Sequence, residues 1–410
     1  MTQVLDQVRS LYEAMPYPPP PKDLTLFKDG RLIPEGSPAS FFHLYWPRET
    51  YRDDLDVLVA GCGTAQAVTL ALRQPGLRVT GIDISQASLD HSAALAERYE
   101  VRNLTLERLP IERVADLRGP FDLIISTGVL HHLDDPAAGL RSLRRMLRPD
   151  GAMLLMVYAS YGRAGVYMMQ EYARLLSVEA EPSQIAAFRQ TLAQCPNYHP
   201  FSIFASRIED LQTDAGLADL LLHPRDRAFS VPQVYDWLSD CGLRFCRWFH
   251  QAPYLPHCSP LMRMPHGKRL LSLPEPQQHA AMELFRGAIN KHTFIACRDD
   301  RPPNTFAISF GDDWPSYVPL RFPGVTVAQD QLPQGVVAVL RNNAHAFADI
   351  AVGLDSAAAR MYQPLDGQRT LGQIAACVKL SAPLERREAM VRSFYETLWR
   401  NDQVFFRVKA

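Results

Sequence analysis

Val57-Leu58-Val59-Ala60-Gly61-Cys62-Gly63-Thr64 is a short apolar run that breaks at a glycine-rich turn, and helix-forming sequence follows it. This pattern predicts a buried strand, a tight turn and a helix N-terminus, a geometry that brings backbone close to a nucleotide-like ligand. Gly81-Ile82-Asp83 follows about twenty residues further on, the spacing expected of a ribose-binding carboxylate. The two stretches together indicate a nucleotide-type site.

Strand-like and helix-like stretches alternate around this turn. Helical stretches at 64–74, 85–99 and 137–147 separate most of the strand-like runs, with Ser85 and Asp135-Pro136 as helix caps. Such alternation predicts an α/β fold with a parallel sheet that is covered on both faces. The expected strands are 56–60, 78–83, 104–106, 121–127 and 152–158, with two more at 243–249 and 293–297.

Length, charge and cysteine content restrict the kinds of protein that this chain can be. The 410 residues predict two or three domains, and a formal net charge of −1 gives no overall field to attract nucleic acid or a membrane surface. The 7 cysteines lack a Cys-x-x-Cys pair, which argues against a disulfide framework and a zinc site, and we expect no metal. Residues 1–10 lack a signal-peptide core and no run reaches the length of a membrane span, so we expect a cytoplasmic protein.

The chain divides into three expected parts. Residues 1–50 combine an amphipathic helix with the proline-rich run 15–21, which is either a stiff connector or a lid that carries Tyr12 and Tyr17. The nucleotide-type domain spans 51–298, with a largely helical substrate insertion at about 160–240. A small accessory domain follows at 303–410, with a helical run at 344–361, a helix at 386–400 and a strand-like run at 404–408.

Four motifs in order over about a hundred residues resemble the class I S-adenosylmethionine-dependent methyltransferases. They are residues 57–64, Gly81-Ile82-Asp83-Ile84-Ser85, residues 121–133 and Leu147-Arg148-Pro149-Asp150-Gly151. Residues 12–18, the Tyr-Gly-Arg segment at 161–163 and residues 223–226 resemble a bacterial group of these enzymes that is sometimes fused to tetratricopeptide repeats. The resemblance implies a seven-stranded Rossmann-like sheet with helical insertions, and S-adenosylmethionine as the methyl donor.

The resemblance also implies where the methyl donor binds. Asp83 would accept hydrogen bonds from the ribose hydroxyls, and the glycines would admit the methionine part. Val59 and Ala65 stand where an acidic residue and a glycine are common in the family. Part of the contact with the methyl donor would therefore come from the N-terminal segment. The expected cofactor residues are Gly61, Cys62, Gly63, Asp83, Ile84, Leu109, Pro110 and Thr127, together with Tyr12 and Tyr17.

The acceptor side is less defined, and no catalytic residue is assigned. His131-His132 could serve as a general base, but such a pair is usually structural in the family, where it caps the helix that begins near Pro136. For the tyrosines of the insertion the alternative is helix packing, and for Arg163 it is a solvated loop position. The substrate-side candidates are Tyr158, Tyr161, Arg163, Tyr167 and His199.

Residues 365–374 and the helix that follows resemble the small winged-helix modules that bind leader peptides in peptide-modifying systems, although a dimerisation or lid domain fits equally well. We therefore expect methyl transfer to a protein or peptide side chain by an enzyme that could be a homodimer. A small-metabolite acceptor is the alternative. From other classes, a nicotinamide-dependent oxidoreductase and a non-catalytic binding protein remain open, although Gln66 replaces the third glycine of the dinucleotide motif.

Overall fold

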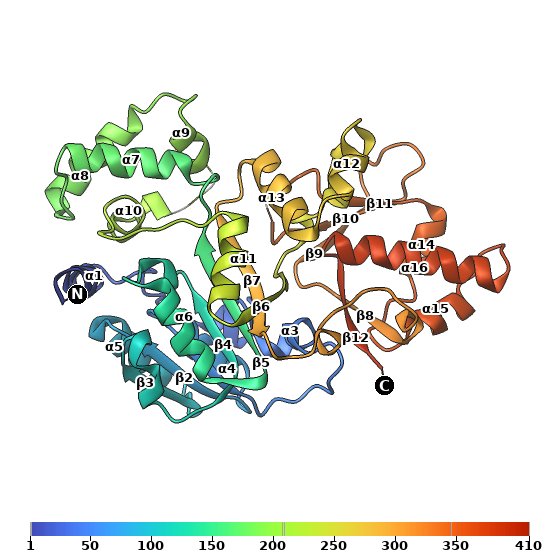
Figure 1. The fold of residues 1–410 in the computed structure, drawn as a ribbon, viewed down its shortest axis with the longest axis horizontal. Coiled ribbons are helices and arrows are strands. Elements are labelled where there is room, and N and C mark those ends of the chain that lie inside the picture. Colours follow the sequence, from blue (N-terminus) through green and yellow to red (C-terminus); the bar gives the residue numbers. More distant parts are fainter. Residues whose placement is uncertain (1, 207, 209, 346, 410) are drawn as a thin grey trace. The chain divides into compact units, whose positions relative to one another are not determined.

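The computed structural model describes residues 2–206, 208, 210–345 and 347–409 (Figure 1). The chain forms two units, of which the first comprises residues 1–39, 52–245 and 286–300. The second comprises residues 40–51, 246–285 and 301–410. The sequence-based division placed residues 40–50 with the N-terminal part and residues 246–285 with the nucleotide-type domain. Contacts within the fold group both segments with the second unit instead.

Seven strands of the described chain form one sheet in the order β3-β2-β1-β4-β5-β7-β6. The expected α/β architecture is confirmed. The first five strands pair in parallel, and β7 runs antiparallel to β5. The strands are β1 (Asp56–Ala60), β2 (Arg78–Asp83), β3 (Leu104–Arg108), β4 (Phe121–Thr127), β5 (Leu147–Tyr158), β6 (Leu243–Trp248) and β7 (Lys291–Arg298).

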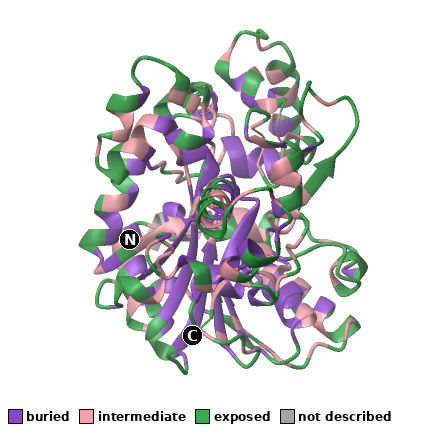
Figure 2. Ribbon diagram, turned by 90° about the vertical axis from the view of Figure 1, so that its right-hand side faces the viewer, coloured by how far each residue is buried: buried purple, intermediate pink, exposed green. Residues whose placement is uncertain are grey.

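The centre of the sheet is buried because its strands carry apolar side chains on both faces. Leu123, Ile124 and Ile125 of β4 are fully buried, as are Met153 and Leu154 of β5. Figure 2 shows these strands as the buried interior of the fold. Continuous burial of this kind is expected when helices cover both faces of a parallel sheet.

Helices α4 (Gln66–Arg73), α5 (Gln86–Arg98) and α6 (Pro136–Arg145) connect the parallel strands. The Ser85 side chain accepts from the backbone N–H of Ser88, and the Asp135 side chain accepts from that of Ala138, so both expected caps are present. The expectation that His131-His132 caps α6 is wrong. Both histidines lie in the preceding 3-10 turn Leu130–His132, and Asp135 occupies the capping position.

The insertion builds a helical layer with a core of its own. It comprises α7 (Ala164–Leu175), α8 (Pro182–Ala193), α9 (Pro200–Ala205), a 3-10 turn (Asp210–Gln212) and α10 (Asp214–Leu221), and α11 (Val231–Asp240) follows. Val166, Ile185, Phe201 and Leu217 pack together at its centre. Leu11 and Met15, at the end of α1 (Thr2–Ala14), pack against the same cluster. The N-terminal segment and the insertion therefore share hydrophobic contacts.

The second unit is built on two small sheets. Strand β8 (Tyr317–Arg321) pairs antiparallel with β12 (Val404–Val408), and β10 (Ala338–Asn342) lies between β9 (Val325–Ala328) and β11 (Ala351–Leu354). Trp314, Tyr317, Tyr395 and Phe406 lie in its core. The helices of this unit are α14 (Ser356–Tyr362), α15 (Leu371–Cys377) and α16 (Leu384–Arg400), together with α12 (Gly267–Leu271) and most of α13 (Glu275–Arg286).

The expected helical run at 344–361 is wrong in its first part. Residues 351–354 form β11, and the helix begins only at Ser356. The Asp355 side chain accepts from the N–H of Ala358 and fixes this start, while Gly353 disfavours helix upstream. The resemblance of the segment to winged-helix modules stays a prediction. Within the described chain, no helix combines the length and apolar character needed to span a membrane.

Candidate active site

The turn after β1 is shaped so that only glycine fits its first position. Gly61 has a φ of +77°, and a Cβ there would lie 2.3 Å from a methyl carbon of Val129. The N–H groups of Gly61 and Cys62 donate to the carbonyl of Ile82, at 2.8 and 2.9 Å. The turn is therefore held against the end of β2, next to Asp83.

Asp83 is oriented by backbone donors. Its Oδ2 accepts from the N–H of Gly63 and its Oδ1 from the N–H of Ser85, both at 2.9 Å. Burial raises the pKa of this carboxyl, although the backbone N–H groups oppose that effect. The carboxylate is thus fixed in place at the mouth of the glycine turn, as a ribose-binding group would need.

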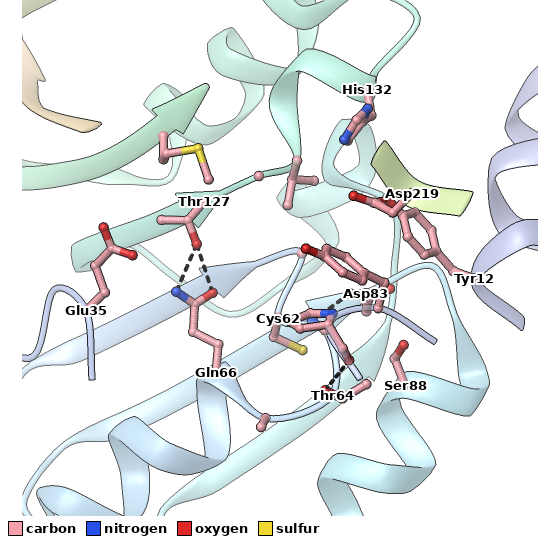
Figure 3. A pocket seen from close by; sticks show the side chains of 18 of the residues that line it. Tyr12, Glu35, Cys62, Thr64, Gln66, Asp83, Ser88, Thr127, His132 and Asp219 are labelled. Carbon is pink, nitrogen blue, oxygen red and sulfur yellow. Dashed lines mark hydrogen bonds between the residues drawn. The ribbon is translucent and has the colours of Figure 1, made fainter. Parts of the chain in front are cut away.

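A cavity of about 1100 Å³ opens above the carboxyl ends of these strands (Figure 3). All ten residues expected to bind the methyl donor line it, and so do Tyr158 and Arg163 from the substrate-side set. A parallel sheet binds ligands at this edge, next to the point where the strand order reverses between β1 and β4. The lining includes Tyr12, Tyr17, Gly61, Cys62, Gly63, Asp83, Ile84, Leu109, Pro110, Thr127, Tyr158 and Arg163.

The N-terminal segment forms one wall of the cavity and is tied to both sides of it. The Tyr12 phenol donates to Oδ1 of Asp219 and the Tyr17 phenol to Oδ1 of Asp210, each at 2.8 Å. On the other side, the Thr64 hydroxyl donates to the carbonyl of Pro18 at 3.0 Å. This arrangement has the geometry of a lid, which the sequence left open against a simple connector.

Arg163 lies inside the fold and carries its own counter-ion. Its guanidinium pairs with Asp226 at 3.1 Å, and the two side chains are only 4% and 2% exposed. The guanidinium carbon also lies 3.5 Å from the centre of the Tyr158 ring, and Gln170 donates to Asp226 at 2.8 Å. The solvated-loop interpretation of Arg163 is therefore wrong, and Arg163, held by this ion pair, forms part of the cavity wall.

Three substrate-side candidates do not line the cavity. Tyr167 contacts Arg163, whose Nε donates to its phenol oxygen at 3.2 Å. His199 caps α9, because its Nδ1 accepts from the N–H of Phe201 at 3.0 Å. Tyr161 lies in the turn before α7 and is half exposed. Tyr167 therefore makes a local packing contact, and His199 makes a helix-capping contact.

Among the polar residues of the cavity that the sequence did not predict are Gln66, Asp210 and Asp219. The Gln66 amide donates to the Thr127 hydroxyl at 2.9 Å, which joins the start of α4 to the end of β4 (Figure 3). Asp219 offered a signal that was not used, because it is a single charge inside the apolar run 216–222. Asp210 offered none, since it follows an irregular polar stretch.

Histidines cluster beside Asp219, but His223 is not oriented to bind a metal. His132, Asp219 and His223 bring ligand-type atoms within 4.8 Å of one another. The Nδ1 of His223 accepts from the N–H of Arg225 at 3.0 Å, so its Nε2 carries the proton and has no lone pair for a metal. Burial lowers the pKa of His131, His132 and His223, which keeps all three rings neutral.

Comparison with known proteins agrees with this geometry. Residues 58–153 match the model of a methyltransferase domain. An uncharacterised protein of Synechococcus sp. is 30% identical over 321 residues, which is 73% of each chain. The chain belongs to the class I S-adenosylmethionine-dependent methyltransferases. The trans-aconitate 2-methyltransferase of Deinococcus radiodurans is 32% identical to this methyltransferase over 154 residues, 37% of this chain and 54% of that one.

The fold of the methyltransferase also has a solved counterpart. PKMT2 from Rickettsia typhi in complex with AdoHcy has a TM-score of 0.64 and 13% identity, and the match covers 90% of this chain and 75% of that one. At this identity the likeness concerns the fold. The methyl donor of the methyltransferase is S-adenosylmethionine, and that the glycine turn and Asp83 hold it stays a prediction.

Proposed function

We propose that this methyltransferase transfers the methyl group of S-adenosylmethionine to a side chain of a protein or peptide. The methyl donor supplies an electrophilic methyl group on a sulfonium, so the reaction is an in-line displacement. The chain would contribute alignment of the acceptor and exclusion of water, since Tyr12 and Tyr17 close one wall of the cavity. Gly61, Gly63 and Asp83 would hold the donor.

The surface of the insertion is the observation that carries the proposal. Large apolar side chains are exposed on α7 and on the segment around α9, among them Leu175 at 76% and Tyr198 at 81%. Several exposed large apolar side chains on one part of the chain are typical of protein-binding surfaces. The same insertion supplies Arg163 and Asp219 to the cavity. The exposed set is Met168, Tyr172, Leu175, Leu176, Tyr198 and Ile203.

The size of the cavity supports the same proposal. Ligand pockets usually measure about 300–1,000 Å³. The present cavity of about 1100 Å³ has room for the donor and for an acceptor chain beside it. The match to PKMT2 extends over 90% of this chain, so the fold beyond the methyltransferase core is shared as well.

A small-metabolite acceptor is the second candidate. It is favoured by the hydrogen bonds that tie Tyr12 and Tyr17 to the insertion, because a closed wall suits a ligand that is enclosed completely.

Transfer of a radiolabelled methyl group to a lysate of the host decides between the two. The lysate is incubated with the enzyme and methyl-labelled S-adenosylmethionine and then separated into protein, nucleic-acid and small-molecule fractions. We expect the label in the protein fraction and its loss with the Asp83→Ala enzyme. Label that enters only the small-molecule fraction would overturn the proposal and favour the second candidate.

A further inference from the structure

We propose that Asp219 is the proton acceptor of the reaction and that the methyl acceptor is a primary amine. The inference rests on the proposed function for the source of that amine, a lysine side chain or the amino terminus of a protein. The role of Asp219 concerns the same cavity and is tested separately. Asp219 is not among the site residues that the sequence predicts.

Asp219 lines the same cavity as Asp83. It is 4% exposed and lines the cavity from α10. Its carboxylate is within 4.8 Å of ring nitrogens of His132 and His223, and His132 follows β4. Figure 3 shows Asp219 between Tyr12 and His132, while Asp83 lies toward Cys62. Asp219 is therefore a neighbour of His132, which follows β4, whereas Asp83 ends β2.

One oxygen of the Asp219 carboxylate is available to accept a hydrogen bond from a ligand. Oδ1 of Asp219 accepts from the Tyr12 phenol at 2.8 Å. Among the residues that the structure describes, Oδ2 has no hydrogen-bond donor. Because Asp219 lines the cavity, this oxygen can accept a hydrogen bond from a ligand N–H group.

The surroundings of Asp219 favour a cationic partner. The nearby cation, Arg163, is already paired with Asp226, and the neighbouring histidines are neutral. Two aromatic rings, those of Tyr12 and Tyr158, line the same cavity, and the Tyr12 phenol is bonded to Asp219. Negative charge next to aromatic faces is the environment in which a protein recognises an ammonium group.

The protonation equilibrium of Asp219 fits the role. Burial, with a further contribution from Asp226 and Asp210, raises the pKa of its carboxyl to about 7, while Tyr12 and Arg163 oppose that effect. A base works best when its pKa lies near the working pH. The charged and titratable groups around it are Tyr12, Tyr17, His132, Tyr158, Arg163, Asp210, His223 and Asp226.

The chemistry balances without any further reactant. A substrate ammonium gives one proton to the Asp219 carboxylate and becomes a neutral amine. The nitrogen lone pair then forms a bond to the methyl carbon as the carbon–sulfur bond breaks, and that electron pair stays on sulfur. The products are a methylated ammonium, S-adenosylhomocysteine and protonated Asp219, which releases its proton to solvent as the site reopens.

Chemical identification of the labelled product tests the acceptor. Labelled protein from the lysate reaction is treated with base and, separately, hydrolysed to amino acids. We expect the label to be stable to base and to migrate with N-methylated amino acids, and the migration position separates lysine from an amino terminus. Label on protein that is lost in base or migrates as an O-methyl or S-methyl derivative would overturn the amine, while label outside protein would overturn the proposed function.

Kinetics of Asp219→Asn test the role of the carboxylate. Asparagine can still accept the Tyr12 hydrogen bond but cannot take the proton, so turnover at pH 7 should fall by about a hundredfold or more. The wild-type rate should rise with pH through an apparent pKa near 7, and Asp219→Asn should lose that dependence, whereas Asp219→Glu should regain part of the rate. Asp214→Asn, on the exposed start of the same helix, is the matched control.

Binding of S-adenosylmethionine separates this role from a simpler one. If Asp219 holds the ammonium of the methyl donor, Asp219→Asn will weaken donor binding and leave the pH dependence of turnover unchanged, and that result would overturn the proposal. Unchanged donor affinity with lost turnover supports it. A full rate with Asp219→Asn would overturn it as well.

Discussion

The phenol of Tyr12 donates a 2.8 Å hydrogen bond to the carboxylate of Asp219, although 207 residues separate the two in the sequence. The bond joins α1 to α10 of the insertion across one wall of the cavity. Tyr17 and Asp210 repeat the arrangement, also at 2.8 Å. The N-terminal segment and the insertion therefore close over the site together, and each depends on the other for its position.

The lid can be tested at Tyr17. In Tyr17→Phe, Asp210 loses its phenol donor, and the segment loses one of its hydrogen bonds to the insertion while the bond from Tyr12 to Asp219 remains. Hydrogen bonds to charged groups contribute about 1.5–3 kcal/mol, so we expect the affinity for S-adenosylmethionine to fall by about tenfold, measured by calorimetry. Tyr198→Phe, at an exposed position, should bind as wild type does. Equal affinities in all three proteins would show that residues 12–18 act only as a connector.

Much of the sheet could be predicted because local sequence determines it. The strands β1, β2 and β4 begin and end where the apolar runs do, and the caps at Ser85 and Asp135 follow from single side chains. The positions around the glycine turn likewise follow from short motifs. These features depend on contacts between residues that are near in sequence, or on a strand order that is common to the family.

The rest depends on contacts that no local pattern contains. The pairing of Tyr12 with Asp219, and the burial of Arg163 against Asp226, arise only when the insertion folds over the sheet. Strand β11 was missed because its four residues lie between stretches of helical composition, and its partner β10 decides its conformation. Tertiary contacts override local preference most readily in short elements.

Stability measurements should show the cost of the Asp219 charge. The folded chain raises the pKa of this carboxyl from 3.8 to about 7, so the unfolded chain ionises first as the pH rises. Wild-type protein therefore loses stability between about pH 4 and pH 7, by at most about 4 kcal/mol at 1.36 kcal/mol for each pKa unit. We expect Asp219→Asn to unfold at a higher temperature than wild type at pH 8, with little difference at pH 4. An advantage that does not depend on pH would contradict this assignment.

The second unit contains a buried ion pair whose removal should destabilise it. The Asp402 carboxylate accepts from the N–H groups of Gln251 and Ala252, at 3.2 and 2.8 Å, and lies 3.6 Å from the Arg247 guanidinium. Asp402→Ala leaves the buried arginine without its counter-ion, which costs about 3–5 kcal/mol. Urea unfolding followed by hydrogen exchange should show this loss in residues of the second unit. Unchanged exchange there would mean that water or another donor compensates.

Titration of S-adenosylmethionine into the wild type, Asp83→Ala and Asp219→Asn tests the division of the cavity most directly. If Asp83 binds the donor as we expect, Asp83→Ala removes charge-assisted hydrogen bonds worth about 1.5–3 kcal/mol and should weaken binding by about ten- to a hundredfold. Asp219→Asn should bind within about threefold of wild type, a difference of less than 1 kcal/mol. Unchanged affinity in Asp83→Ala, or a large loss in Asp219→Asn, would contradict a donor end at Asp83 and an acceptor end at Asp219.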